Sequence, residues 1–140
     1  MQPRILGAPA ALLMIHGMQG LHLTADLRGC APGAALMVDP DALRRCCLRA
    51  VHDAGLQAVG ELFHRFAPPG GVTGVVLLAE SHLAVHTWPE LASVTLDVYV
   101  CNRDADNSGR ARELMARLQA LFAPQASERH QLLRGGPGAP

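Results

Sequence analysis

Apolar and polar residues alternate along residues 18–27 and again along residues 93–101. A period of two predicts β-strands that bury one face and leave the other accessible. The apolar positions are Leu21, Leu23, Ala25, Leu27, Val94, Leu96, Val98 and Val100. The other face of the second strand carries Thr95, Asp97, Tyr99 and Cys101, which is polar enough to line a site.

Further strands are predicted from runs rich in apolar and β-branched residues, at 57–66, 72–79, 83–88 and 129–133. The run at 72–79 is apolar throughout, as expected of a strand inside a sheet. Pro89 ends the strand at 83–88, because proline cannot donate to a sheet ladder. Residues 28–38 are predicted to form a loop, because they contain Gly29, Pro32 and Gly33.

Two helices are predicted from apolar stripes at helical spacing. The first begins at Asp39, which is a good N-cap, and continues with Pro40 and Asp41, which suit a first turn. Gly55 ends it. Its stripe consists of Leu43, Cys46, Cys47, Ala50, Val51 and Ala54. The second helix runs from Asn107 or Ser108 to about Phe122, with Leu114, Met115, Leu118, Leu121 and Phe122 facing inward.

The predicted order is strand, helix, several strands, helix, strand. This order fits an α+β two-layer sandwich, in which two helices cover one face of a mainly antiparallel sheet. A chain of 140 residues is expected to form one domain, here at 18–134. Residues 1–17 are interpreted as a loose extension, and residues 135–140 as a disordered tail.

Composition narrows the function classes. The 12 basic and 12 acidic side chains cancel, which argues against a nucleic-acid partner and permits self-association. The apolar patch at residues 6–15 is too short to span a membrane. The 4 cysteines contain no C-x-x-C pair, so reduced thiols in a cytoplasmic protein are expected, with no metal.

Reactive side chains are concentrated in residues 80–90, Glu-Ser-His-Leu-Ala-Val-His-Thr-Trp-Pro-Glu. Ser81 follows an apolar strand, with His86 five residues on, so it is either an activated nucleophile or a turn serine. His86 is either a catalyst or a structural histidine. Cys101 is either a small buried apolar residue or a thiol that acts as acid or nucleophile. A hydrolase triad is not supported, because no G-x-S-x-G motif surrounds Ser81.

Four motifs together resemble the prokaryotic S-adenosylmethionine decarboxylase proenzyme family. They are Gly20-Leu-His-Leu, Phe63-His-Arg-Phe66, the block from Gly74 to Glu90, and Asp97-Val-Tyr-Val-Cys101. The motifs occur in the order of the family, and the spacings from Ser81 to His86 and to Cys101 match its pattern. The resemblance extends from about residue 20 to residue 121.

The resemblance implies a self-cleaving enzyme. Ser81 Oγ would attack the carbonyl of Glu80, and β-elimination of the resulting ester, assisted by His86, would lead to a pyruvoyl group. The β chain would be residues 1–80 and the α chain residues 81–140. Thr73 stands where the family usually has a serine that supports this processing.

The resemblance also implies how the enzyme works. The pyruvoyl group would form a Schiff base with the substrate amine and serve as electron sink, without pyridoxal phosphate or metal. Cys101 would return a proton to the α-carbon. Phe66 and Trp88 would contact the adenine and sulfonium of S-adenosylmethionine, and Glu90 the ribose. Family members are homodimers of αβ units with sites near the subunit interface, and their product supplies aminopropyl groups for spermidine.

The chain departs from the family pattern beyond Glu90, where Leu91-Ala92-Ser93 replaces a frequent Tyr-Gly-Tyr. Asn102 also follows Cys101 where glycine is frequent. These changes leave open the alternative of the same machinery acting on L-ornithine or L-arginine. A further alternative is an inactive regulatory homologue, against which the intact Ser81, His86 and Cys101 argue. Trp88 and Glu90 favour the nucleoside substrate.

Overall fold

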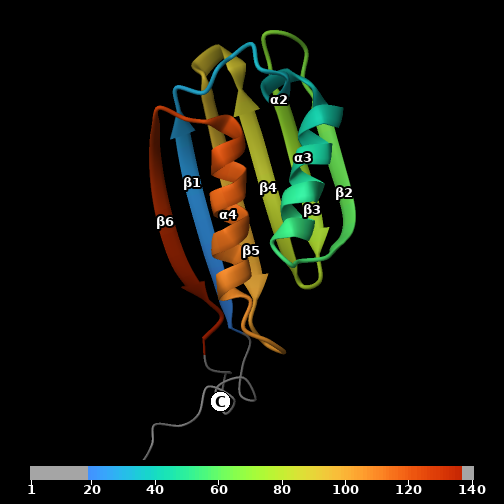
Figure 1. Ribbon diagram of the computed structural model, residues 1–140, viewed down its shortest axis with the longest axis vertical. Coiled ribbons are helices and arrows are strands. Elements are labelled where there is room, and N and C mark those ends of the chain that lie inside the picture. Colours follow the sequence, from blue (N-terminus) through green and yellow to red (C-terminus); the bar gives the residue numbers. More distant parts are fainter. Residues whose placement is uncertain (1–18, 137–140) are drawn as a thin grey trace, which may run out of the picture.

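A six-stranded antiparallel sheet forms one layer of the protein (Figure 1). The computed structural model describes residues 19–136; the predicted extension at 1–17 and most of the predicted tail lie outside this range. The strands are β1 (Gly20–Arg28), β2 (Ala58–Arg65), β3 (Val72–Leu78), β4 (Ser81–Trp88), β5 (Ser93–Cys101) and β6 (Ala126–Arg134). Their order across the sheet is β2-β3-β4-β5-β1-β6.

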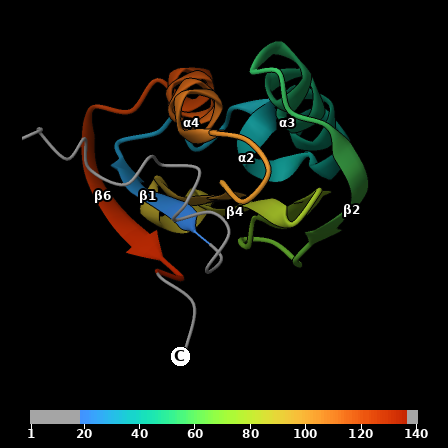
Figure 2. The same ribbon diagram turned by 90° about the horizontal axis from the view of Figure 1, so that it is seen from below.

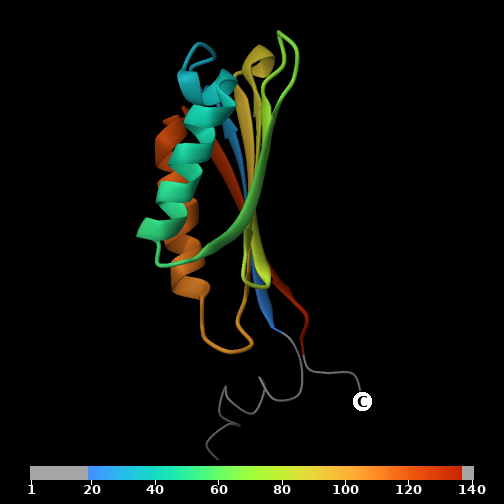
Figure 3. The ribbon, with the colours of Figure 1, turned by 90° about the vertical axis from the view of Figure 1, so that its right-hand side faces the viewer.

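The helices form the second layer, and all of them lie on the same face of the sheet (Figures 2 and 3). They are α2 (Ala35–Val38), α3 (Pro40–Asp53) and α4 (Ser108–Phe122), and a short 3-10 helix, η1 (Pro89–Leu91), follows β4. The predicted α+β two-layer sandwich is therefore confirmed. No helix within residues 19–136 is long and apolar enough to cross a membrane.

The core lies between the helices and the sheet, because alternate residues of each inner strand point toward the helices. The buried strand residues include Leu21, Leu23, Val76, Leu83, Val85, Leu96 and Val98. The opposite face carries no helix and is called the open face below. The run at 72–79 is therefore buried on one side only: Leu77, on the open face, is 50% exposed.

The first helix begins as predicted. The Asp39 carboxylate accepts hydrogen bonds from the backbone N–H groups of Asp41 and Ala42, at 2.9 and 3.3 Å. The predicted loop at 28–38 is wrong in its last part, where α2 forms a single turn. The physical reason is Met37, whose side chain this turn directs into the core, where it is 1% exposed.

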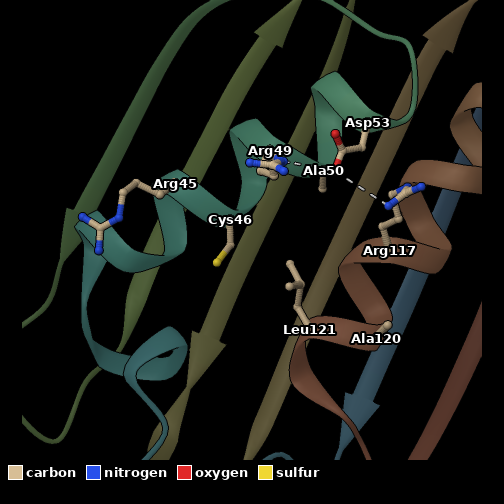
Figure 4. A pocket seen from close by; sticks show the side chains of 8 residues that line it. All are labelled: Arg45, Cys46, Arg49, Ala50, Asp53, Arg117, Ala120 and Leu121. Atoms are coloured by element: carbon tan, nitrogen blue, oxygen red, sulfur yellow. Dashed lines mark hydrogen bonds and ion pairs between the residues drawn. The ribbon is translucent and has the colours of Figure 1, made fainter.

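Two residues predicted to face the core do not. Cys46 is only half-buried, and Leu121 is 36% exposed. Both line a groove between α3 and α4 (Figure 4). Each lies at the edge of its helical stripe and faces the groove, so its side chain is only partly covered. Cys47 and Phe122 occupy the buried positions instead.

The end of α4 offers a test of this backbone geometry. Ala123 has φ +41° and ψ +55°, the left-handed conformation in which a Cβ is unfavourable. We expect Ala123→Gly to raise the free energy of unfolding by about 1 kcal/mol, measured by urea denaturation. Ala116→Gly, at an exposed position inside the same helix, is the control and is expected to lower it by about 1 kcal/mol. Equal losses in both variants would contradict the assignment.

Candidate active site

The hairpin between β3 and β4 carries the predicted cleavage site in its turn. Leu78 pairs with Ser81, so the turn consists of Ala79 and Glu80 alone. Glu80 has φ +51°, which is the left-handed region. A non-glycine residue held there is strained by roughly 1–3 kcal/mol. The peptide bond between Glu80 and Ser81 therefore lies directly beside a strained residue.

Ser81 and Cys101 lie side by side although they are 20 residues apart in sequence. The Ser81 hydroxyl oxygen accepts a hydrogen bond of 3.0 Å from the backbone N–H of Cys101. This contact follows from the antiparallel pairing of β4 with β5, in which His82 is opposite Tyr99. Cys101 is 7% exposed, so its thiol is largely shielded from water. Ser81 and Cys101 thus lie together where β4 begins and β5 ends.

A second group of predicted residues lies at the other end of β4. Phe66, Thr73, His86, Trp88 and Glu90 all line one hollow of about 330 Å³. Thr73 Oγ1 lies 3.0 Å from His86 Nδ1, since the two residues are paired across β3 and β4. The rings of His86 and Trp88 are stacked, with centroids 5.6 Å apart. The predicted processing and substrate residues therefore form one cluster, called the aromatic hollow below.

The two groups are far apart within one chain. Ser81 and His86 are five residues apart on the straight strand β4, which corresponds to about 16 Å at the usual rise of a strand. The structure thus brings together Ser81 with Cys101, and His86 with Thr73 and Trp88. It does not bring His86 to the Ser81 of the same chain.

A third group lies on the open face, and the sequence reasoning did not assign it. His22 Nε2 and Asp97 Oδ1 are 2.8 Å apart, and the rings of His82 and Tyr99 are stacked. Burial lowers the pKa of His82, the neighbouring His22 lowers it further, and Asp97 opposes the shift. The alternation at 93–101 indicated that Asp97 and Tyr99 lie on a polar face. It could not indicate His22 and His82, because these residues come from other strands.

Residues 21–135 match the family model described as S-adenosylmethionine decarboxylase. The S-adenosylmethionine decarboxylase proenzyme of Pyrococcus furiosus is 36% identical over 104 residues, which cover 74% of this chain and 73% of that protein. The chain belongs to the S-adenosylmethionine decarboxylase family. Enzymes of this family are pyruvoyl-dependent carboxy-lyases.

Other relatives agree with this family assignment. The S-adenosylmethionine decarboxylase proenzyme of Acetivibrio thermocellus is 35% identical over 101 residues, covering 72% of this chain and 79% of that protein. The crystal structure of the adenosylmethionine decarboxylase from Aquifex aeolicus VF5 has a similar fold. Its TM-score is 0.72 at 30% sequence identity, and the match covers 88% of this chain and 93% of that one.

The groove between α3 and α4 has a volume of about 520 Å³, which is larger than the aromatic hollow, but it is formed by the helices and not by the open face of the sheet. None of the predicted site residues lines it. Its arginines Arg49 and Arg117 pair with Asp53, at 3.3 and 3.9 Å (Figure 4). A hydrogen bond with His52 and the charges of both arginines lower the pKa of Asp53. Asp53 and these two arginines therefore form a surface ion-pair cluster at the groove.

Within residues 19–136, no group of three or more histidine, cysteine, aspartate or glutamate side chains is arranged to hold a metal ion.

Thr87 ties the aromatic hollow to the rest of this decarboxylase fold. Its buried hydroxyl accepts a hydrogen bond from the Val72 N–H and donates one to the Met37 carbonyl, both 2.8 Å long. Position 71, next to this bond, requires glycine, because a Cβ on Gly71 would lie 2.2 Å from the Thr87 carbonyl oxygen. One hydroxyl thus joins β3, β4 and α2 directly behind His86 and Trp88.

We expect Thr87→Val to lower the free energy of unfolding by about 1–3 kcal/mol, because it leaves a buried N–H and a buried carbonyl without partners. The measurement is urea denaturation of the uncleaved Ser81→Ala chain. Thr87→Ser keeps the hydroxyl and is the control, with a smaller loss. A valine variant as stable as its parent would show that the bridge is dispensable.

Proposed function

We propose that this chain is a self-cleaving decarboxylase that converts S-adenosylmethionine to its decarboxylated form, the aminopropyl donor for spermidine. The observation that carries the proposal is Ser81, which follows the strained Glu80 and lies beside Cys101, in a chain of the decarboxylase family. Relatives across bacteria and archaea are named proenzymes, which agrees with a precursor that must be cut.

Cleavage uses groups of the chain itself. Ser81 Oγ attacks the Glu80 carbonyl carbon, the peptide C–N bond breaks, and the nitrogen takes up a proton, so that an ester joins the two residues. Loss of the Ser81 α-proton then breaks the Cβ–Oγ bond and releases Glu80 as a carboxylate. Hydrolysis of the remaining dehydroalanine releases ammonia and leaves a pyruvoyl group on residue 81. The strain at Glu80 favours the first step, because the ester frees this residue from its turn.

A pyruvoyl group on residue 81 would supply the electron sink that decarboxylation needs. The residues around Ser81 suit such a group, since Ser81 is half-buried and hydrogen-bonded to the backbone N–H of Cys101, whose side chain is shielded from water. Cys101 is assigned the role of proton donor to the substrate α-carbon. Phe66 and Trp88 offer aromatic faces to the adenine and to the sulfonium cation, and Glu90 accepts hydrogen bonds from the ribose.

The site requires two copies of the chain. His86 lies about 16 Å from Ser81 along β4, which is too far for proton transfer in the same protomer. A twofold axis between two open faces, perpendicular to the strands, brings His86 of the partner subunit to Ser81. The contact between Thr73 and His86 Nδ1 then leaves Nε2 as the nitrogen that exchanges the proton.

The open face also has the composition of a covered surface. It carries the apolar side chains Leu62, Leu77 and Leu132, which are 76%, 50% and 56% exposed in the single chain. Monomers rarely leave such residues on an uncovered sheet face. We therefore assign this face to a homodimer of αβ units. The 4 free cysteines support a reducing, cytoplasmic environment.

Cleavage is expected to give two chains, residues 1–80 and 81–140, that separate only under denaturing conditions. Denaturing mass spectrometry of wild-type protein checks this. Ser81→Ala is expected to show one intact mass and to release no carbon dioxide from S-adenosylmethionine, whereas L-ornithine and L-arginine give none with either protein. A single mass from active wild-type protein would rule out the mechanism. Carbon dioxide released from L-ornithine or L-arginine would identify that amino acid, and not S-adenosylmethionine, as a substrate.

Co-expression tests the shared site. Ser81→Ala and His86→Ala are each expected to be inactive alone. Mixed dimers contain one site in which both residues are intact, so the mixture should recover about a quarter of the wild-type sites. Cleaved His86→Ala chains, distinguished by mass, and carbon dioxide release are the measurements. A site built within one chain predicts no recovery, although mixed dimers form.

A further inference from the structure

Three rings form a continuous row on the open face, close to the cleavage site. His82, Tyr99 and His22 are direct neighbours across β4, β5 and β1. The His82 and Tyr99 rings are stacked, with centroids 5.7 Å apart and planes at 29°. The Tyr99 and His22 rings meet edge to face, with centroids 6.0 Å apart. Aromatic pairs at these separations attract each other beyond the area they bury.

The far side of the row is fixed by polar contacts. His22 Nε2 lies 2.8 Å from Asp97 Oδ1, and the Arg134 guanidinium lies 5.9 Å from the centre of the Tyr99 ring. The Tyr99 ring also lies over Gly20, where any Cβ would be 2.5 Å from the tyrosine oxygen. Tyr99 is therefore held from several sides, and it offers His82 a rigid platform.

Cleavage removes two of the contacts that hold residue 81 in the precursor. The hairpin turn is cut, so β4 begins at residue 81 as a free chain end, and such ends fray. The Ser81 oxygen also leaves with Glu80, which abolishes its 3.0 Å hydrogen bond with the Cys101 N–H. Residue 81 must nevertheless stay beside Cys101 in every turnover. The next residue along the chain is His82.

We propose that His82, stacked on Tyr99, is a positioning residue that holds the new end of the α chain beside Cys101 after cleavage. This inference rests on the proposed self-cleavage at Ser81. Burial and the neighbouring His22 lower the pKa of His82, while Asp97 opposes the shift; the net effect disfavours a positive charge beside a cationic substrate. The stack with Tyr99 needs only a flat ring at residue 82, not an imidazole.

The experiment compares His82→Ala, His82→Phe and the control His52→Ala, an exposed histidine on α3. In the uncleaved Ser81→Ala background, all three are expected to unfold at the temperature of their parent, within a few degrees. With Ser81 present, cleaved chain is counted by mass spectrometry, and kcat is expressed per cleaved chain. We expect His82→Ala to lose about tenfold in kcat, because small misplacements of reacting groups are costly, with His82→Phe close to wild type.

Hydrogen exchange supplies a second readout. The amides at the start of β4 should exchange faster in cleaved His82→Ala than in cleaved wild type, with no difference between the uncleaved proteins. Wild-type kcat per cleaved chain in His82→Ala would overturn the inference. So would a phenylalanine variant as slow as the alanine variant, a failure of His82→Ala to cleave, or a large loss of stability before cleavage. An uncleaved wild-type protein would instead refute the proposed function.

Discussion

The register between β4 and β5 is the constraint on which the rest of the site depends. It sets His82 opposite Tyr99 and brings the Ser81 oxygen to the Cys101 N–H. A slip of one residue would exchange the two faces of β4, sending its histidines toward the helices and Leu83 and Val85 to the open face. Burial of those two apolar side chains therefore holds His82 and His86 on the open face.

The same alternation explains why helices cover only one side of the sheet. β1, β4 and β5 each present apolar residues to α3 and α4 and polar or aromatic residues to the open face. A sheet face with histidines, a tryptophan and exposed leucines is neither a core nor an ordinary solvated surface. Its mixed character agrees with the proposed site between two subunits, where substrate, water and protein would meet.

Much of the fold and part of the site could be predicted from the sequence. Local rules were sufficient for the existence of the strands and for the Asp39 cap, because period and capping depend on neighbours in the chain. They missed the start of two strands, since β4 begins at Ser81 and not at residue 83, and β6 at Ala126 and not at residue 129. They failed at Met37, Cys46 and Leu121, where tertiary packing decides which side of a stripe is covered. The family pattern predicted Ser81, His86 and Cys101 together. Their spacing in sequence could not show that Ser81 and His86 lie near opposite ends of one strand. The row of His22, His82 and Tyr99 needs the order of strands in the sheet, which no local pattern supplies.

The two-residue turn at Ala79 and Glu80 has a consequence for how the protein can fold. While the turn is intact, β3 and β4 are joined, and their pairing is a fast local event with little loop entropy to overcome. A cut at this turn makes the same pairing an encounter between two separate chains, whose recovery after denaturation depends on concentration. The precursor must therefore complete its fold before it is cut, and the mature protein depends on the slowness of its unfolding to stay assembled.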